Sequence, residues 1–420
     1  MTRIRRASRQ TFRSLSTRNF RLYLAGQIIS ASGSWMQQIA QVWLVLSITG
    51  SGIALGTVTA LQFLPVLLGG AWAGLIVDRV DKRKLLIATS VISMFLAASL
   101  GTLVALDLAE LWMIYIFASL LGCLTALDSP ARRSFVTELV PEEHAANAVS
   151  LNSSAFTAAR IVGPAVAGLI IAATGIAWCF FINGVSFLAL IAALLLMHLT
   201  AIQRSMPVVR AKGQIREGFA YVWSMPALRT TLLMTAFIGT LSFNFQITLS
   251  LIAKKTFGGD AGTFGSMYAL MSIGALVGSL VVAHREQANT RFVIRSALIF
   301  GFLMLFAAFA PSLQVLMVVL LPVGATSVAF LSSAGALLQS RSSPEFRGRV
   351  AALFAVAFIG STPIGGPIVG AVSQLIGPRA GLLLGALTAL VTGALALRAL
   401  NGRSADRRRT RQFQDPALAT

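Results

Sequence analysis

The chain is poor in acidic residues, histidine and cysteine. Its 420 residues include 14 Asp and Glu, three His and two Cys. The cysteines, Cys123 and Cys179, lie in separate apolar segments without metal-ligand spacing and are best explained as small apolar residues. The sequence has no cluster of His, Cys, Asp or Glu at catalytic spacing and no glycine-rich phosphate-binding motif. These absences argue against an enzyme, an ATP-driven machine, a metal site and a bound cofactor.

Charge of either sign is scarce: 11% of the residues are charged, whereas 56% are hydrophobic. The mean hydropathy is +0.79, and long apolar runs recur along the whole chain. A bilayer core is spanned by about 20 apolar residues per helix. The sequence therefore predicts an all-α polytopic membrane protein with twelve transmembrane helices, placed at roughly 20–47, 52–77, 85–106, 110–132, 147–173, 177–198, 227–251, 262–284, 292–310, 313–339, 348–374 and 378–399.

The net charge of +20 raises the question of nucleic-acid binding, but the position of the cations argues against it. Nearly all Lys and Arg lie in the termini and in alternate connections between the predicted spans. This distribution is the positive-inside signature, and it predicts that both termini are cytoplasmic. The basic C-terminal tail is then a topology anchor or a contact to anionic membrane lipid. The exceptions are Lys254, Lys255 and Arg379 in the other set of connections, and Arg160 inside a span.

The longest interior connection separates two sets of six spans. Its second part carries aromatic residues on one helical face, which predicts a helix along the membrane surface. The predicted organisation is a cytoplasmic N-terminal segment at 1–19, a six-helix bundle at 20–198, a linker with the surface helix at 199–226, a second six-helix bundle at 227–400 and a basic tail at 401–420.

The two halves share a proline spacing. Pro141 and Pro164 are separated by the same number of residues as Pro344 and Pro367; the first proline of each pair lies in the loop before the fifth span of its half, and the second lies within that span. The second proline of each pair follows a glycine, in Gly163-Pro164 and Gly366-Pro367. The shared spacing indicates two pseudo-symmetric repeats of six helices, the architecture of major facilitator transporters.

The connection after the second span, "GLIVDRVDKRK", is unusually rich in charges of both signs. Cations alone would suffice for topology, so its two carboxylates suggest pairing that holds one side of the protein shut. The stretch resembles the signature loop of the major facilitator superfamily, except that Asp81 stands where that family usually has glycine. By this resemblance, the residues expected to gate the cytoplasmic side are Asp78, Arg79, Lys82, Arg83 and, at the start of the eleventh span, Arg349.

Other segments resemble the enterobactin-exporter-like branch of the drug:proton antiporters within that superfamily, over about 20–400. They include "SGSWMQQIAQVWLVLSITGS", "SPARRSFVTELVP" and "AARIVGPAVAG". The resemblance implies proton-coupled export of a small amphipathic organic compound, siderophore-like or a drug, by a monomer in the bacterial inner membrane. It also implies that helix five carries an exporter motif. The residues expected to act as its hinge, with their counterparts in helix eleven, are Gly163, Pro164, Gly168, Gly366 and Pro367.

Arg160 is a charged residue inside a predicted span, where its burial in the membrane would cost much free energy. It lies about 20 Å into its span at the helical rise per residue, so it must face protein or water rather than lipid. Its partners are predicted to be substrate or, alternatively, carbonyl groups or Gln37 in a purely structural role. In the related fold, the first helix of each triplet lines the central cavity. The cavity residues expected beside Arg160 are therefore Ser34, Gln37, Gln38, Asn244 and Thr326, with aromatic walls that include Trp35.

No acidic residue lies in the middle third of a predicted span, although proton relays usually use intramembrane carboxylates. Asp128 is the best candidate for proton coupling, and Asp78 is the second. Asp128 also has a simpler interpretation as a helix-end partner of Arg132 or Arg133.

Two alternatives to siderophore export stay open at this point. The first is a multidrug or antibiotic efflux pump with no siderophore role. The second is a membrane sensor or scaffold that transports nothing, against which the lack of extra domains argues.

Overall fold

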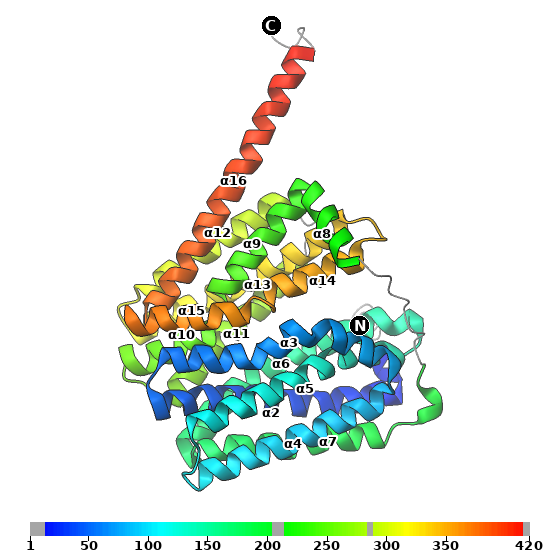
Figure 1. Ribbon diagram of the computed structural model, residues 1–420, viewed down its shortest axis with the longest axis vertical. Coiled ribbons are helices and arrows are strands. Elements are labelled where there is room, and N and C mark those ends of the chain that lie inside the picture. The colour runs from blue at the N-terminus through cyan, green and yellow to red at the C-terminus, as the bar shows by residue number, and fades with distance from the viewer. Residues whose placement is uncertain (1–12, 204–213, 284–288, 415–420) are drawn as a thin grey trace, which may run out of the picture. The chain divides into compact units, whose positions relative to one another are not determined.

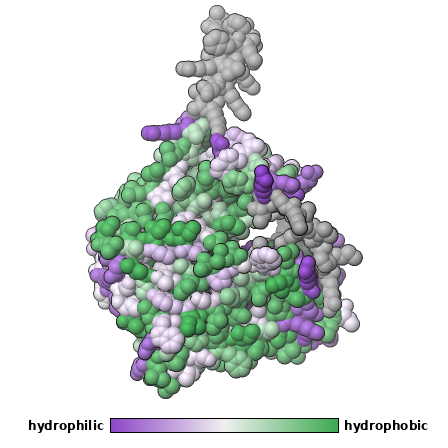
Figure 2. Space-filling view, viewed as in Figure 1, coloured by the Kyte–Doolittle hydropathy of each residue, from purple (hydrophilic) through white to green (hydrophobic). Residues whose placement is uncertain are grey.

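The computed structural model describes residues 13–203, 214–283 and 289–414 (Figure 1). The predicted segments 1–19, 199–226 and 401–420 therefore lie partly outside the described residues. The described residues are almost entirely helical, which confirms the predicted fold class. The face shown in Figure 2 is largely apolar. Large apolar side chains are exposed on many helices, among them Trp72, Phe95 and Leu169. Such a surface suits a lipid environment rather than water.

Within the described residues, eleven helical segments are long and apolar enough to cross a membrane. The remaining long helix, α2 (Arg18–Thr49), has 32 residues and completes the twelve predicted spans. Its mean hydropathy is lowered by Gln27, Gln37, Gln38 and Gln41. A membrane helix with such polar residues must face other helices or water, and three of these glutamines are buried.

The first half of the chain forms the helices α2 to α7, which run alongside one another in Figure 1. Short connections are possible because the helix ends are capped locally. Gly50 ends α2 in the left-handed region at φ 60°, and the Ser51 hydroxyl accepts from the backbone N–H of Ala54. Beyond α2, the bounds are α3 Gly52–Arg79, α4 Lys82–Ala105, α5 Leu111–Glu138, α6 Glu142–Thr174 and α7 Ile176–Leu195.

Two predicted spans of the second half are broken. The span expected at 227–251 consists of α9 (Pro226–Ser242) and α10 (Phe245–Leu251), followed by a π-helical turn at Ile252–Thr256. The span expected at 348–374 consists of α14 (Arg347–Phe358) and α15 (Thr362–Leu375). The other helices of this half are α8 Gln214–Ser224, α11 Ala261–Ala283, α12 Thr290–Ala308, α13 Leu313–Arg341 and α16 Ala380–Gln414.

The helix breaks coincide with the boundaries between two compact units. The first unit comprises Met1–Ala211, Asn244–Ser272 and Thr362–Pro378, and the second comprises Lys212–Phe243, Ile273–Ser361 and Arg379–Thr420. The first unit thus contains the whole predicted N-terminal bundle together with two parts of the predicted C-terminal bundle. Segments on either side of the breaks at 243–244 and 361–362 therefore belong to different units.

The surface helix predicted in the linker is present as α8, within the second unit. The ring of Tyr221 stacks on Phe346 with centroids 4.2 Å apart, and Val222 is fully buried. The rings of Phe219 and Trp223 stack on each other at 4.8 Å and remain exposed. One face of α8 thus packs on the protein while the other exposes two aromatic rings, an arrangement that suits a membrane surface; the Arg229 guanidinium lies 5.9 Å from the centroid of the Trp223 ring.

In the first unit, α3 packs on α15 through facing glycines. A Cβ at Gly56 would lie 2.5 Å from the carbonyl oxygen of Gly366, and a Cβ at Gly370 would lie 2.2 Å from that of Gly52. Only glycine permits this approach of two backbones, as in small-residue packing of membrane helices. The glycine of the second Gly-Pro pair thus belongs to a helix contact.

We expect Gly56→Ala to destabilise the protein by about 1–3 kcal/mol, because the added methyl group overpacks the α3–α15 contact. Gly69→Ala on the same helix is the matched control, since nothing lies within 4 Å of a Cβ at that position. Thermal unfolding of the purified variants in detergent measures the difference. Equal melting temperatures for the two variants would show that the contact does not contribute to stability.

Candidate functional site

Arg160 lies near the middle of α6, where its guanidinium meets two aromatic rings from other helices. The guanidinium carbon is 5.3 Å from the ring centroid of Trp35 on α2 and 6.0 Å from that of Tyr268 on α11. The two rings are themselves 6.4 Å apart. A cation over aromatic faces gains about 0.5–2 kcal/mol, depending on how far it is removed from water. All three residues belong to the first compact unit.

The charge of Arg160 is incompletely satisfied by the protein. Its Nε atom is buried and has no hydrogen-bond partner among the described residues. Gln37, the structural partner considered from the sequence, instead accepts a hydrogen bond from Asn183 at 2.6 Å. An unpaired buried donor costs about 1–3 kcal/mol, and more when it is charged. The Nε–H of Arg160 is therefore an unsatisfied buried donor within the described residues.

Glycine brings α6 against α2 at this point. A Cβ at Gly163 would lie 2.6 Å from the Cβ of Trp35 and 2.7 Å from the carbonyl oxygen of Ser32. Gly163 follows Arg160 by about one helical turn, so both residues lie on neighbouring positions of the α2-facing surface. The close approach at Gly163 thus places Trp35 beneath the arginine.

A second glycine contact brings α6 against α11. A Cβ at Gly265 would lie 2.6 Å from the carbonyl oxygen of Pro164, and a Cβ at Gly168 would lie 2.9 Å from the Cα of Gly262. Tyr268 follows Gly265 by one turn of α11 and so reaches the guanidinium. Gly163, Pro164 and Gly168 of the exporter motif thus pack against α2 and α11 in the turns of α6 that follow Arg160, while their predicted role as a hinge stays a prediction.

The other predicted cavity residues are dispersed. On α2, Ser34 is exposed and Gln38 is half-buried, on either side of the buried Gln37. Asn244 is buried at the break before α10 in the first unit. Thr326 is half-buried on α13 in the second unit, where its hydroxyl donates to the carbonyl oxygen of Pro322 at 2.7 Å. Of this set, Ser34, Gln37 and Gln38 share helix α2 with Trp35, which contacts Arg160.

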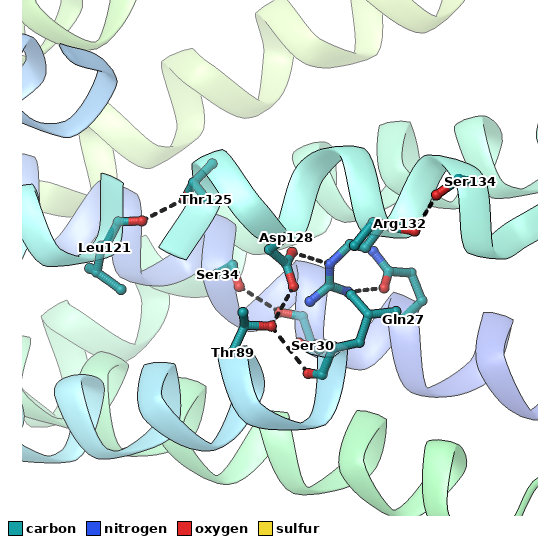
Figure 3. A network of polar contacts seen from close by, with 11 residues as sticks. Gln27, Ser30, Ser34, Thr89, Leu121, Thr125, Asp128, Arg132 and Ser134 are labelled. Atoms are coloured by element: carbon teal, nitrogen blue, oxygen red, sulfur yellow. Dashed lines mark hydrogen bonds and ion pairs between the residues drawn. The ribbon is translucent and has the colours of Figure 1, made fainter. Parts of the chain in front are cut away.

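Asp128 belongs to a polar network in the same unit, shown in Figure 3. The guanidinium of Arg132 donates to Asp128 and to the side-chain oxygen of Gln27. The hydroxyl of Thr89 donates to Asp128 at 2.9 Å. The side chains of Asp128 and Arg132 are only 20% and 17% exposed. The pairing with Arg132 considered from the sequence is thus present, and the role of Asp128 in proton coupling stays a prediction.

The predicted gate residues of the charged loop make contacts within the first unit. Lys82 forms a buried ion pair with Glu138 at 2.5 Å. Arg83 donates through Nε to the carbonyl oxygen of Leu194 at 2.6 Å, and Asp81 caps α4 by accepting from the backbone N–H of Lys84. These interactions fasten the start of α4 to α5 and α7.

The remaining gate residues do not meet in one unit. Asp78 is half-buried and Arg79 is exposed at the end of α3 in the first unit. Arg349 lies in the second unit, where it pairs with Glu217 of α8 at 2.8 Å and lies over the ring of Phe346 at 4.8 Å. A gate formed by Asp78 and Arg349 therefore stays a prediction.

Two important residues were not predicted from the sequence. Tyr268 lies in an apolar helix, and its only signal is the spacing from Gly265 in "GSMYAL". Glu138 is the last residue of α5 and carries no motif that marks it as the partner of Lys82. The Arg160–Tyr268 contact joins helices that are distant in the sequence, and the Lys82–Glu138 pair joins the start of α4 to the far end of the next helix, α5.

The helical architecture is that of the major facilitator fold, as two solved structures show. A bacterial homologue of the human lysosomal transporter Spinster, inward-facing and occupied, matches with a TM-score of 0.71 at 15% identity, over 92% of this chain and 97% of that one. A bacterial homologue of the iron transporter ferroportin, inward-facing, matches with 0.72 at 15% identity, over 91% and 98%. Residues 9–420 match the transmembrane secretion effector family of that superfamily, and the chain belongs to it.

Curated relatives are transporters of the same superfamily. The multidrug efflux pump Tap of Mycobacterium tuberculosis is 28% identical over 390 residues, or 90% of this chain and 92% of the relative. The staphyloferrin A transporter of Staphylococcus aureus is 28% identical over 257 residues, and the uncharacterized transporter YfiS of Bacillus subtilis is 28% identical over 269. The matches to the latter two cover 63% of each relative's length. The resemblance recognised from the sequence and the expectation of a non-enzymatic transporter are confirmed.

The buried Lys82–Glu138 pair gives a test of the loop's structural role. We expect Glu138→Gln to lower stability by about 3 kcal/mol or more, because it leaves the charge of a buried lysine unpaired. Glu143→Gln is the matched control, since the Glu143 side chain is 67% exposed and its ion pair with Arg13 is 3.9 Å long. Thermal unfolding in detergent measures both, and a loss for Glu138→Gln no larger than for the control would contradict the assignment.

Proposed function

We propose that this transporter exports a small amphipathic organic anion by alternating access, and that Arg160 binds the anionic group of the substrate. The observation that carries the proposal is the Arg160 guanidinium, which contacts two aromatic rings and has a buried Nε without a partner among the described residues. Trp35 and Tyr268 supply apolar faces beside the charge. A ligand with one acidic group and an apolar or aromatic body fits both features.

The relatives support export and leave the substrate class open. They include a staphyloferrin A transporter, a multidrug efflux pump and a macrolide efflux protein of Streptococcus pyogenes. Siderophore-like compounds and drugs are therefore both candidates, and efflux of drugs alone is the runner-up. Membership of a transporter family favours either of these over a sensor or scaffold.

The proposed location is the bacterial inner membrane, with both termini in the cytoplasm. The support is the concentration of Lys and Arg in alternate connections. In this orientation, the glycine contacts of α3 with α15 and of α6 with α11 lie toward the outer face. The proposed working unit is the monomer, as the superfamily resemblance implies.

Arg160→Ala tests the binding role. In proteoliposomes loaded with candidate anionic siderophores and drugs, we expect at least a tenfold loss of efflux, equivalent to about 1.4 kcal/mol. Arg160→Lys should recover part of it, since it keeps the charge but not the planar fork. Arg291→Ala removes an exposed cation and serves as the control.

The amount and melting temperature of folded protein separate the two roles considered for Arg160. The proposal expects both to stay at the wild-type level in Arg160→Ala, because the protein itself leaves part of the guanidinium unbonded. Normal efflux per folded molecule, combined with a loss of folded protein, would contradict substrate binding and establish a structural role.

Proton coupling through Asp128 is the second part of the proposal. In Asp128→Asn we expect exchange of substrate across the membrane to continue, while efflux driven by a pH gradient falls to the rate without a gradient. Asp107→Asn, at an exposed loop position, is the control. Gradient-driven efflux by Asp128→Asn at the wild-type rate would contradict the role of Asp128. Efflux by the wild-type protein that ignores the gradient for every transported compound would contradict proton coupling altogether.

A further inference from the structure

One face of α6 is polar and at least partly exposed in the part of the helix that precedes Arg160; it is called the open face below. Ser150 and Ser153 are exposed and Thr157 is half-buried, although the helix belongs to the membrane-spanning set. These residues and Arg160 are spaced by three or four positions, so they lie along one face of the helix. Exposed Val149 and Phe156 flank them on the same face. The stretch is therefore a mixed polar and apolar wall that leads to the arginine.

The same face is buried in the part of the helix that follows Arg160. Pro164 and Gly168 continue it by helical spacing, and both are buried. They are covered by Gly262 and Gly265 of α11, whose backbone approaches them without room for a side chain. Arg160 thus lies at the position where the open face of α6 ends and the packed face begins.

The open face must border water rather than lipid. The hydroxyls of Ser153 and Thr157 donate to the carbonyl oxygens four residues earlier, at 2.9 Å each, so by themselves they are tolerable in lipid. Arg160 on the same face is not, because a charged side chain in hydrocarbon is strongly unfavourable. The opposite face of this stretch is occupied by buried Ala148, Ala155 and Ala159, which pack within the bundle.

We infer that the α6 face of Ser150, Ser153 and Thr157 forms one wall of an aqueous path by which an anionic substrate reaches Arg160 from the start of the helix. This inference rests on the proposed function and adds a route and a charge preference to it. The hydroxyl groups offer weak hydrogen bonds to a moving solute, and the arginine at the end of the path attracts anions.

Cysteine accessibility tests the path without knowledge of the substrate. Cys123 and Cys179 are first replaced by alanine, and Ser153→Cys, Thr157→Cys and the control Val162→Cys are introduced one at a time. Val162 is 48% exposed and close to Arg160 in the helix, but faces away from the polar stretch. Inverted membrane vesicles are treated with the anionic reagent sulfonatoethyl methanethiosulfonate and with its trimethylammonium counterpart.

The expected result is modification of Ser153→Cys and Thr157→Cys about tenfold or more faster than Val162→Cys, because a thiolate forms in water and not in lipid. At Thr157→Cys the ratio of anionic to cationic reagent rates should fall about fivefold or more when Arg160→Gln is added or when salt shortens the screening length. If Arg160→Gln folds poorly, the dependence of the rate ratio on salt still tests the anion preference.

Rates at Ser153→Cys and Thr157→Cys as slow as at Val162→Cys would overturn the aqueous path. Rapid modification with a charge ratio that ignores both Arg160→Gln and salt would overturn the anion preference. Because modification requires no transport, failure of this inference is distinguishable from failure of the proposed function, which is measured by efflux.

Discussion

A single cation near the middle of a membrane helix, in contact with aromatic rings, is the constraint on which the rest of the structure depends. Placing arginine at such a depth costs somewhere between about 3 and about 15 kcal/mol. The cation–π contacts with Trp35 and Tyr268 offset about 1–2 kcal/mol of this cost. The balance must come from water or from an anionic ligand, because Nε has no partner within the described chain. Hydration of the site, or the binding of an anion that we propose, would offset the remaining cost.

The glycine contacts explain how three helices meet around that charge. Gly163 allows α6 to reach α2, and Gly265 allows α11 to reach α6. Arg160 and Trp35 come from the first half of the sequence, whereas Tyr268 comes from the second. A substrate that neutralises the arginine therefore acts on a contact to which both repeats contribute, as binding at the repeat interface of an alternating-access transporter requires.

The sequence alone predicts the fold well because membrane helices have a strong local signal. Apolar runs gave the spans, the basic residues gave a topology, and "AARIVGPAVAG" marked Arg160 and the packing glycines. The breaks at 243–244 and 361–362 were missed, because hydropathy continues across them. Gln37 was placed beside Arg160 by depth, but the rotation of α2 turns it to Asn183 and presents Trp35 instead. Depth follows from counting residues, whereas rotation and partners such as Tyr268 depend on tertiary packing.

The central claim is that the guanidinium of Arg160 binds the anionic group of the substrate. A structure of the protein with a transported anionic compound bound tests it most directly. The account predicts that an oxygen of the ligand's anionic group lies within hydrogen-bonding distance of the Arg160 guanidinium, and that the ligand's apolar part packs against Trp35. A ligand bound elsewhere, with Arg160 contacting only protein groups, would contradict it.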